Sequence, residues 1–168
     1  IGSTNITARN KLHRIFHFFK QKESLLNVEG LVSVCHKLGT THTGALIVIE
    51  RSVPLDFVIA TGDKMNLELS GPIIESIFYK NSPLHDGAIV IRGNTIVATR
   101  VILPVAAEDT LPKHYGLRHR AAVSITEKTD ATALVVSEET GHISYFKNGN
   151  FVRFANEEEL IKMIQEDN

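Results

Sequence analysis

Three short stretches of almost purely apolar residues constrain the fold of this chain more than any other feature. They cover residues 44–49, 88–92 and 132–137. Such short apolar runs are typical of buried strands. A strand that is apolar on both faces must be covered on both faces, as happens when helices pack above and below a sheet. The three stretches therefore predict the buried strands of a helix-covered sheet.

Helix caps and turn residues predict the other elements. The sequences Gly93-Asn94 and Asn148-Gly149 predict two hairpin turns, and residues 51–71 are expected to be irregular. With 168 residues, the chain is predicted to form a single α/β (α+β) domain with a central mixed β-sheet flanked by helices. The predicted helices cover 8–22, 28–38, 72–79, 117–128 and the residues after Asn156, and the predicted hairpin strands cover 88–92, 95–103, 143–147 and 151–154.

The N-terminal part of the chain differs from the rest in charge. Residues 1–30 carry five basic and two acidic residues, and the basic residues alternate with leucine, isoleucine and phenylalanine. Two interpretations remain open: a packed surface helix, or a segment that lies next to a membrane. We expect residues 1–27 to form a basic N-terminal helix or linker and residues 28–168 to form the main domain.

The composition excludes several classes of protein. With 18 Lys and Arg against 19 Asp and Glu, the chain is not expected to bind nucleic acid in general. Cys35 is the single cysteine, so neither an intrachain disulfide nor a cysteine-based zinc site can form. No apolar run approaches the roughly 20 residues of a membrane span. The sequence also contains neither GxxxxGK[ST] nor GxGxxG, which disfavours P-loop and Rossmann nucleotide sites.

The first candidate site is the segment Pro83-Leu84-His85-Asp86-Gly87-Ala88. Asp86 stands just before a predicted buried strand, where a carboxylate with a fixed position could bind a metal or accept a proton. Gly87 would let a ligand approach the backbone closely. His85 is a weaker candidate than Asp86. The alternative interpretation is an ordinary turn, because Asp-Gly is common turn chemistry.

The second candidate site is Arg118-His119-Arg120, at the predicted start of a helix. A helix N-terminus carries a partial positive charge, so cations there are unfavourable unless an anion compensates them. Exposed N–H groups and arginines together suit a phosphate. In a helix, Arg118 and Arg120 are about 200° apart, so one would bind a ligand while the other pairs inside the protein.

The third candidate site is Ser137-Glu138-Glu139-Thr140-Gly141, where two acidic residues follow a buried strand. A solvated turn is the alternative interpretation. Taken together, the three segments offer carboxylates for a divalent cation and basic groups for phosphates. This combination is what phosphoryl or nucleotidyl transfer requires.

In this order and spacing, the three segments resemble the diadenylate cyclase domain, over about residues 28–155. The resemblance implies a DAC-type fold and a nucleotidyltransferase that condenses two ATP molecules into cyclic di-AMP and releases two pyrophosphates. It further implies a divalent metal, Mn²⁺ or Mg²⁺, and a homodimer in which two subunits meet face to face. A two-fold interface suits a symmetric product made from two identical substrates.

The resemblance also implies roles for individual residues. Asp86 would bind the metal and help to activate the attacking 3′-hydroxyl, with Arg118 and His119 as the other catalytic residues. Glu139 is the expected second metal ligand, and Glu138 or His85 could substitute for it. The residues expected to contact ATP are Gly87, Ala88, Leu103, Leu117, Arg118, His119, Arg120, Ser137 and Glu138, with Leu46 and Leu103 at the adenine ring.

Two residues depart from the pattern of the family. Leu117 stands where a threonine is expected before Arg118, and leucine cannot supply a hydroxyl to a phosphate. His142 follows Gly141 where a second glycine is common, so the turn beside Glu139 could differ.

The best match within the family is the membrane-tethered branch, whose three N-terminal transmembrane helices are absent from this chain. The implied location is the cytoplasmic side of a membrane, reached through a missing N-terminal segment, and a regulatory protein partner is implied as well. A soluble branch with autoinhibitory N-terminal helices is the alternative. Two other functions stay open: a non-catalytic regulator of the same fold that binds adenine nucleotides, and a metal-dependent phosphohydrolase.

Overall fold

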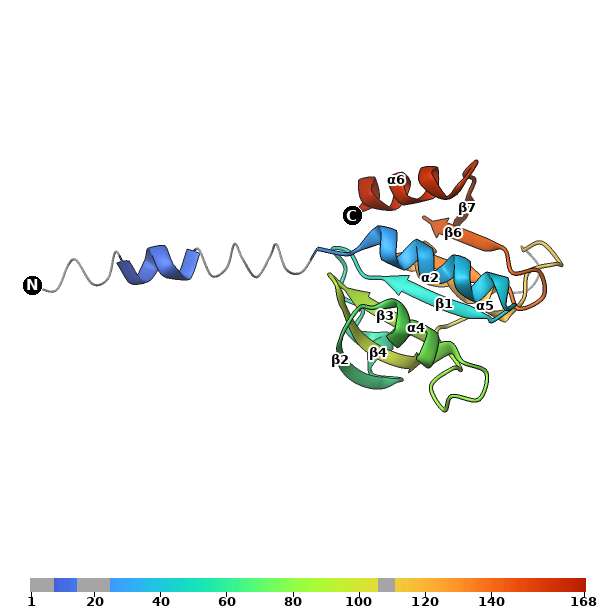
Figure 1. The fold of residues 1–168 in the computed structure, drawn as a ribbon, viewed down its shortest axis with the longest axis horizontal. Helices are drawn as coiled ribbons and strands as arrows, with labels where there is room; N and C mark the ends of the chain where they lie inside the picture. The colour runs from blue at the N-terminus through green and yellow to red at the C-terminus, as the bar shows by residue number, and fades with distance from the viewer. Residues whose placement is uncertain (1–7, 15–24, 106–110) are drawn as a thin grey trace, which may run out of the picture.

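A computed structural model describes residues 8–14, 25–105 and 111–168 of the protein. Within these residues, seven strands form one sheet in the order β2-β4-β3-β1-β5-β6-β7 (Figure 1). The strands are β1 (Ala45–Ile49), β2 (Asp63–Glu68), β3 (Ala88–Arg92), β4 (Thr95–Val101), β5 (Thr132–Val136), β6 (Ile143–Lys147) and β7 (Asn150–Val152).

The sheet is mixed, as the sequence predicts. The central strands β1 and β3 are parallel, and the other neighbouring strands pair antiparallel. Gly44 and Gly87 precede the two parallel strands, so they lie at the same end of the sheet. Because β5 is antiparallel to β1, the end of β5 reaches this same end, where Val136 pairs with Ala45.

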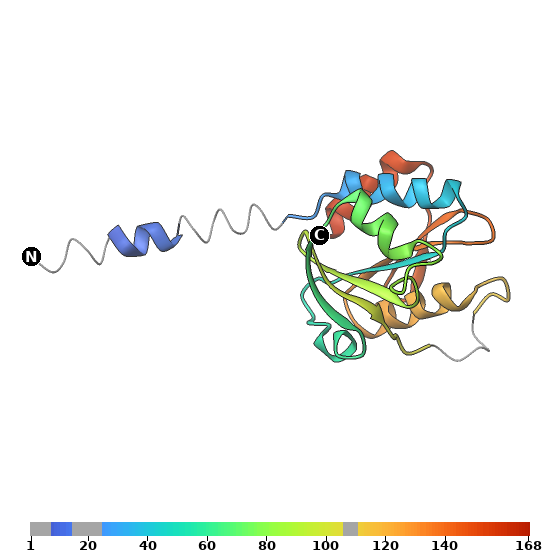
Figure 2. The ribbon, with the colours of Figure 1, turned by 60° about the horizontal axis from the view of Figure 1, so that its bottom comes forward.

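Helices cover both faces of the sheet (Figure 2). Among the described residues, three helices pack on one face and two on the other, which confirms the prediction drawn from the apolar strands. The first face carries α2 (Val28–Thr40), α4 (Gly71–Phe78) and α6 (Glu157–Asp167), and the second carries α3 (Asp56–Ile59) and α5 (Leu117–Lys128).

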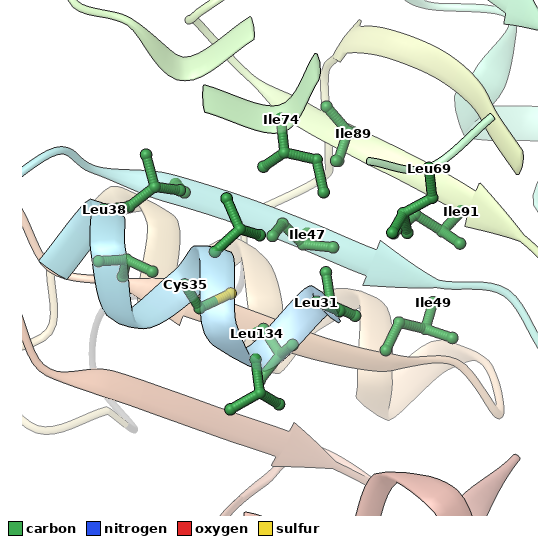
Figure 3. Packing of buried hydrophobic residues seen from close by; sticks show 14 of the residues in the cluster. Leu31, Cys35, Leu38, Ile47, Ile49, Leu69, Ile74, Ile89, Ile91 and Leu134 are labelled. Atoms are coloured by element: carbon green, nitrogen blue, oxygen red, sulfur yellow. The ribbon is translucent and has the colours of Figure 1, made fainter. Parts of the chain in front are cut away.

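Strand β1 shows how the two layers arise from one apolar run. All five of its residues are buried, and alternate side chains enter opposite cores. Ala45, Ile47 and Ile49 belong to the core under α2, α4 and α6, part of which Figure 3 shows. Leu46 and Val48 belong to the core under α3 and α5. The central strand is thereby held from both sides, which fixes the position of the loop before it.

In the described part of the chain, α2, α4 and α6 begin at side-chain caps. The side-chain oxygens of Asn27, Ser70 and Asn156 each accept a hydrogen bond from a backbone N–H in the first turn. Such caps satisfy donors that a helix start leaves open. The predicted cap at Asn156 is confirmed. By contrast, α5 begins after Gly116 with no side-chain cap.

The prediction that residues 51–71 are irregular is wrong, because this stretch forms α3 and β2. Helix α3 has four residues, too few for a periodic pattern. Strand β2 lies at the edge of the sheet, and its exposed positions carry Lys64, Asn66 and Glu68, residue types that strands disfavour.

Other element boundaries differ slightly from the predicted ones. Helix α2 continues to Thr40, β4 ends at Val101, and β7 is shorter than predicted. Of the helix predicted over 8–22, residues 8–14 are helical, and the remainder lies outside the described residues.

Candidate functional site

A cavity of about 1300 Å³ opens at the end of the sheet where β1 and β3 begin. It is built from segments that lie far apart in the sequence but end at this one edge. Its lining includes Gly44 before β1, Asp86 and Gly87 before β3, Val101 at the end of β4, Glu138 after β5, and Arg118 on α5. All three candidate segments of the sequence therefore contribute to one cavity.

Asp86 forms the acidic wall of this cavity, together with His85. The carboxylate is 85% exposed, and its Oδ1 lies 3.2 Å from Nε2 of His85. The other ring nitrogen of His85, Nδ1, lies 2.7 Å from the carbonyl oxygen of Ser82. A carbonyl oxygen only accepts, so Nδ1 is the donor in this contact.

The pair formed by His85 and Asp86 fits a divalent metal ion. Metal–ligand distances of about 2.1 Å place adjacent ligands about 3 Å apart, close to the Nε2–Oδ1 separation of 3.2 Å. The Ser82 carbonyl fixes the ring in the orientation that a metal ligand needs. Among the described residues, no three His, Cys, Asp or Glu side chains form a group that could hold a metal. Further ligands would therefore come from a substrate or from water.

Gly87 joins this acidic wall to strand β4. Its φ is +80°, a backbone conformation that residues with a side chain rarely adopt. A Cβ on Gly87 would also lie 2.8 Å from the carbonyl oxygen of Val101 and 2.9 Å from the carbonyl carbon of Arg100. Ala88 is fully buried and pairs with Val101 instead of lining the cavity. The glycine is thus required for Asp86 to stand against the β4 backbone.

Arg118 forms a basic wall of the cavity, and its charge is opposite in sign to that of Asp86. It occupies the first turn of α5, whose uncapped N-terminus leaves backbone N–H groups available to an anion. The guanidinium lies against Gly44, where a Cβ would come within 2.5 Å of Nη1. Its Nη1 is 3.6 Å from Oε2 of Glu138, a loose contact between partly exposed groups. The side chain is positioned by packing more than by a strong ion pair.

His119 and Arg120 take the other sides of α5, as the 100° helical step predicts. The ring of His119 stacks on Tyr115 at 5.3 Å between centroids and lies 6.2 Å from Phe146. Burial lowers the pKa of His119, and the charges of His114 and Arg118 add to this effect. The Nε of Arg120 donates to the carbonyl oxygen of Tyr115 at 3.2 Å. Neither residue is part of the cavity lining.

The turn that follows β5 places Glu138 and Glu139 differently. The hydroxyl of Ser137 accepts hydrogen bonds from the N–H groups of Glu139 and Thr140, both at 3.2 Å. Glu138 lines the cavity beside Arg118. Glu139 is exposed and is not part of the lining, and its charge acts instead on His119, whose pKa it raises against the effect of burial. The structure thus brings His85 and Asp86 together but does not gather Glu139 with them.

Between its acidic and basic walls the cavity is apolar. Leu46 and Leu103, the residues expected at an adenine ring, both line it, and both are buried. Leu117 also lines it and is 76% exposed. Other exposed apolar side chains of the lining are Tyr79, Ile102 and Val105. The arrangement suits a ligand with an apolar ring and an anionic chain.

Several lining residues were missed by the sequence reasoning. They include His42, Lys80 and Ile102, together with Arg100 and Asp63 in a smaller cavity beside the first. Lys80 comes three residues before the Pro83 segment, a proximity that could have indicated it. Asp63 could not be found, because it belongs to the edge strand that carried no recognisable pattern.

The comparisons with known proteins show the family of the chain. A family model described as the DisA bacterial checkpoint controller nucleotide-binding domain (DAC) matches residues 32–151. The diadenylate cyclase CdaS of Bacillus thuringiensis is 44% identical over 119 residues, which are 71% of this chain and 59% of that protein. The cyclic di-AMP synthase CdaA of Bacillus subtilis is 38% identical over 138 residues, 82% of this chain and 50% of that protein.

Two solved structures share the fold. A double mutant of DacA from Staphylococcus aureus matches with a TM-score of 0.79 and 36% identity, over 83% of this chain and 93% of that one. A hypothetical membrane-spanning protein from Bacillus cereus matches with a TM-score of 0.72 and 41% identity, over 76% and 63% of the two chains.

The chain spans about half the length of several of the curated relatives it matches. In the part of the chain that the structure describes, no helix combines the length and the apolar character that crossing a bilayer requires. The match of the family model covers well over half of the residues, and the relatives agree with it. The chain therefore belongs to the diadenylate cyclase family.

Proposed function

We propose that residues 28–168 form a diadenylate cyclase domain that condenses two ATP molecules into cyclic di-AMP and releases two pyrophosphates. The observation that carries the proposal is the arrangement of one cavity. His85 and Asp86 form one wall, Arg118 and the open N-terminus of α5 form another, and an apolar floor lies between them. This arrangement offers each part of ATP a matching surface.

Arg118 would bind the phosphates. Its guanidinium can donate two parallel hydrogen bonds to phosphate oxygens, and the N–H groups at the start of α5 add a partial positive charge. Glu138 holds Arg118 only loosely, at 3.6 Å, so the pair can open for a ligand. Leu46 and Leu103 would contact the adenine ring. Roles in binding ATP for His119, Arg120 and Ser137 would be indirect, through the shape of α5 and of the turn.

His85 and Asp86 would hold the divalent metal, whose bound form neutralises phosphate charge and lowers the pKa of an attacking hydroxyl. In the reaction, the 3′-oxygen of one ATP bonds to the α-phosphorus of the other, and the bond from that phosphorus to the bridging oxygen breaks. Pyrophosphate leaves, and the 3′-hydroxyl loses its proton, for which the Asp86 carboxylate in the cavity wall is the proposed acceptor. The reaction occurs twice to close the ring.

Catalysis would need two subunits, because each cavity is proposed to hold one ATP. Exposed apolar side chains surround the cavity, among them Tyr79, Ile102 and Leu117. Burial of such side chains favours association, and a two-fold interface brings identical edges together. Facing cavities would place each 3′-hydroxyl near the opposite α-phosphorus, so that positioning supplies much of the rate.

We also propose that the full-length protein is tethered to a membrane and that this domain lies on the cytoplasmic side. The similarity to a membrane-spanning protein and the basic charge of residues 1–30 support this proposal. Fractionation of cells that express the full-length protein would test it. Recovery of the domain in the soluble fraction would contradict it.

The test of the activity is to incubate the purified chain with ATP and Mn²⁺ and to identify the products by chromatography and mass spectrometry. We expect cyclic di-AMP and pyrophosphate from the parent protein. We expect at least about a 100-fold lower rate from Asp86→Asn, because a carboxylate that binds metal and substrate contributes several kcal/mol. The melting temperature should be nearly unchanged, since Asp86 is exposed.

The alternative outcomes separate the other functions. Inorganic phosphate or AMP would indicate a phosphohydrolase, and bound ATP without product would indicate a nucleotide-binding regulator. A second series at increasing protein concentration distinguishes a regulator from an enzyme that has not dimerised. The rate per subunit rises with concentration only for the enzyme.

A further inference from the structure

A second, smaller cavity of about 350 Å³ adjoins the first. The two cavities share Asp86, Gly87 and Ile102 as lining residues, so the wall between them is the candidate metal-binding loop. The remaining lining comes from β2, β4 and the residues before β2, including Asp63 and Arg100. The small cavity is thus an extension of the large one on the far side of Asp86.

The backbone at Arg100 has an uncommon conformation. Its φ is +52°, in the left-handed region that residues other than glycine rarely adopt. The pairing of β3 with β4 shifts register here, between Ala88 and Val90, and the backbone of Arg100 lies against Gly87. Such outliers concentrate at functional sites. The bulge places the Arg100 side chain beside the small cavity instead of continuing the strand pattern.

One hydrogen bond, from Nε to Asp63, holds the Arg100 side chain, and its Nη groups make none among the described residues. Its Nε donates to Oδ2 of Asp63 at 2.5 Å, and the side chain remains half-exposed. Asp63, and more weakly Asp86, raise the pKa of Arg100, so its charge is permanent. A guanidinium has five N–H donors. Within the described residues, the structure gives Arg100 no hydrogen bond besides the one to Asp63, so both Nη groups remain for a ligand.

Arg92, on the neighbouring strand β3, provides a contrast. It donates to Glu50 through Nε and Nη2, at 2.6 and 2.9 Å, and Nη2 also lies 3.3 Å from Asp56. Arg92 lines neither cavity. Within the described residues, Arg92 thus donates three hydrogen bonds to carboxylates of the protein, as expected of an arginine that supports the fold. Arg100 donates one and lies at a cavity wall.

We propose that Arg100 is a further phosphate-binding residue, which contacts the phosphate chain of a nucleotide from the side of Asp86 that faces the small cavity. This inference rests on the proposed function, since it assigns a residue to the same site. Asp63 holds the guanidinium in place, and the Nη groups donate to phosphate oxygens. The charge of Arg100 also offsets the negative charges of Asp63 and Asp86, which would otherwise repel a phosphate.

The proposal predicts that loss of the Arg100 charge weakens the binding of one ligand, the nucleotide, but not that of the other, Mn²⁺. Loss of the Arg100 charge should weaken nucleotide binding by about tenfold, the usual effect of one hydrogen bond to a charged group. The same change should leave Mn²⁺ binding without nucleotide unchanged or about threefold tighter, because a cation beside Asp86 repels the metal. A purely structural role would weaken both.

The experiment measures the affinities of Arg100→Gln for 3′-deoxy-ATP by calorimetry and for Mn²⁺ by electron paramagnetic resonance. The nucleotide without a 3′-hydroxyl cannot react, so binding is observed alone. Lys64→Gln is the matched control, because it removes one positive charge from the exposed side of β2, away from both cavities. Arg100→Lys should recover part of the nucleotide affinity.

A third variant, Arg100→Gly, separates the charge from the backbone. Glycine relieves the left-handed strain, so this variant should melt at a temperature equal to or above that of the parent and still bind the nucleotide about tenfold more weakly. Parent-like nucleotide affinity in Arg100→Gln would overturn the proposal. Equal weakening in Lys64→Gln, or a loss of both ligands together, would overturn it as well.

The outcome is separate from that of the cyclase assay. If the parent protein binds 3′-deoxy-ATP but forms no cyclic di-AMP, the proposed activity fails while the role of Arg100 can still stand. If cyclic di-AMP forms and Arg100→Gln binds the nucleotide normally, the activity stands and the role of Arg100 fails.

Discussion

The two ends of the central strands carry similar charged residues, but these residues differ in how fully they are hydrogen-bonded inside the protein. Where β1 and β3 end, Glu50 accepts from Arg92 at 2.6 and 2.9 Å and from the N–H of Leu55 at 2.9 Å. Asp130 accepts from the N–H groups of Ser52 and Val53, both at 2.9 Å. These carboxylates close loops and have their bonds satisfied inside the protein.

Where β1 and β3 begin, the charged groups are held loosely. Asp86 is 85% exposed with His85 at 3.2 Å, and Arg118 is 3.6 Å from Glu138. Carboxylates and arginines therefore serve the fold at one end of the sheet and remain available at the other. Residue type alone does not distinguish these two roles, whereas the degree of internal hydrogen bonding does.

The largest expected effect concerns Arg118, which lies at the end of the sheet where β1 and β3 begin, called the open end below. Replacement by methionine keeps much of the packing on Gly44 but removes the donors for phosphate. We expect a decrease in the rate of cyclic di-AMP formation of at least about 100-fold, because Arg–phosphate bonds are charge-assisted. The free energy of unfolding should change by less than about 0.5 kcal/mol. A large loss of stability would show that the open end also supports the fold.

Arg92→Met tests the opposite end of the sheet, where β1 and β3 end, called the closed end below. Glu50 is only 8% exposed. Without Arg92 its charge would be buried, with the N–H of Leu55 as its remaining hydrogen-bond partner among the residues that the structure describes. We expect the free energy of unfolding to fall by about 2–3 kcal/mol, measured by urea denaturation. Affinity for 3′-deoxy-ATP should be unchanged well below the melting temperature. A weaker affinity for 3′-deoxy-ATP at a temperature where the variant is fully folded would contradict the distinction between the two ends.

Gly44→Ala would sharpen the comparison, because it acts on Arg118 without removing it. The new Cβ would come within 2.5 Å of Nη1, so the guanidinium must move away from its position. We expect about tenfold weaker binding of 3′-deoxy-ATP, measured by calorimetry, with a smaller effect than that of Arg118→Met. Gly71→Ala is the control, since a Cβ there meets nothing within 4 Å.

The smallest expected effect is a pH dependence at His119. Burial lowers the pKa of this ring below its ordinary value of 6.5, so the folded state favours the neutral form. The unfolded chain binds a proton more readily, and stability present above about pH 6.5 is lost as the pH falls below that value. His119→Gln should therefore reduce the drop in melting temperature between pH 7 and pH 5, by about 2 °C. An identical drop in both proteins would contradict this.

The sequence predicted those parts of the molecule that depend on local pattern. The all-apolar strand β1 indicated a sheet covered on both faces, and the helical step separated Arg118 from Arg120. Both predictions are confirmed, because burial and helix geometry are periodic properties.

Other parts depend on contacts between distant segments and left no local pattern. The edge strand β2 is half polar, so Asp63 and its partner Arg100 could not be recognised. The sequence favoured Glu139 over Glu138 as the second metal ligand. The hydrogen bonds to Ser137 set the course of the turn, and there Glu138 lines the cavity while Glu139 does not. The roles predicted for these residues in metal and phosphate binding stay predictions.

The most direct test of the distinction between the two ends is to titrate the isotopically labelled protein with 3′-deoxy-ATP and to follow its backbone amides by NMR. We predict shifts at the open end, at Gly44, Gly87 and Arg118, with the amides of Ser52, Val53 and Leu55 unaffected. Shifts centred on the closed end, or no shifts at millimolar nucleotide, would contradict the assignment of the site.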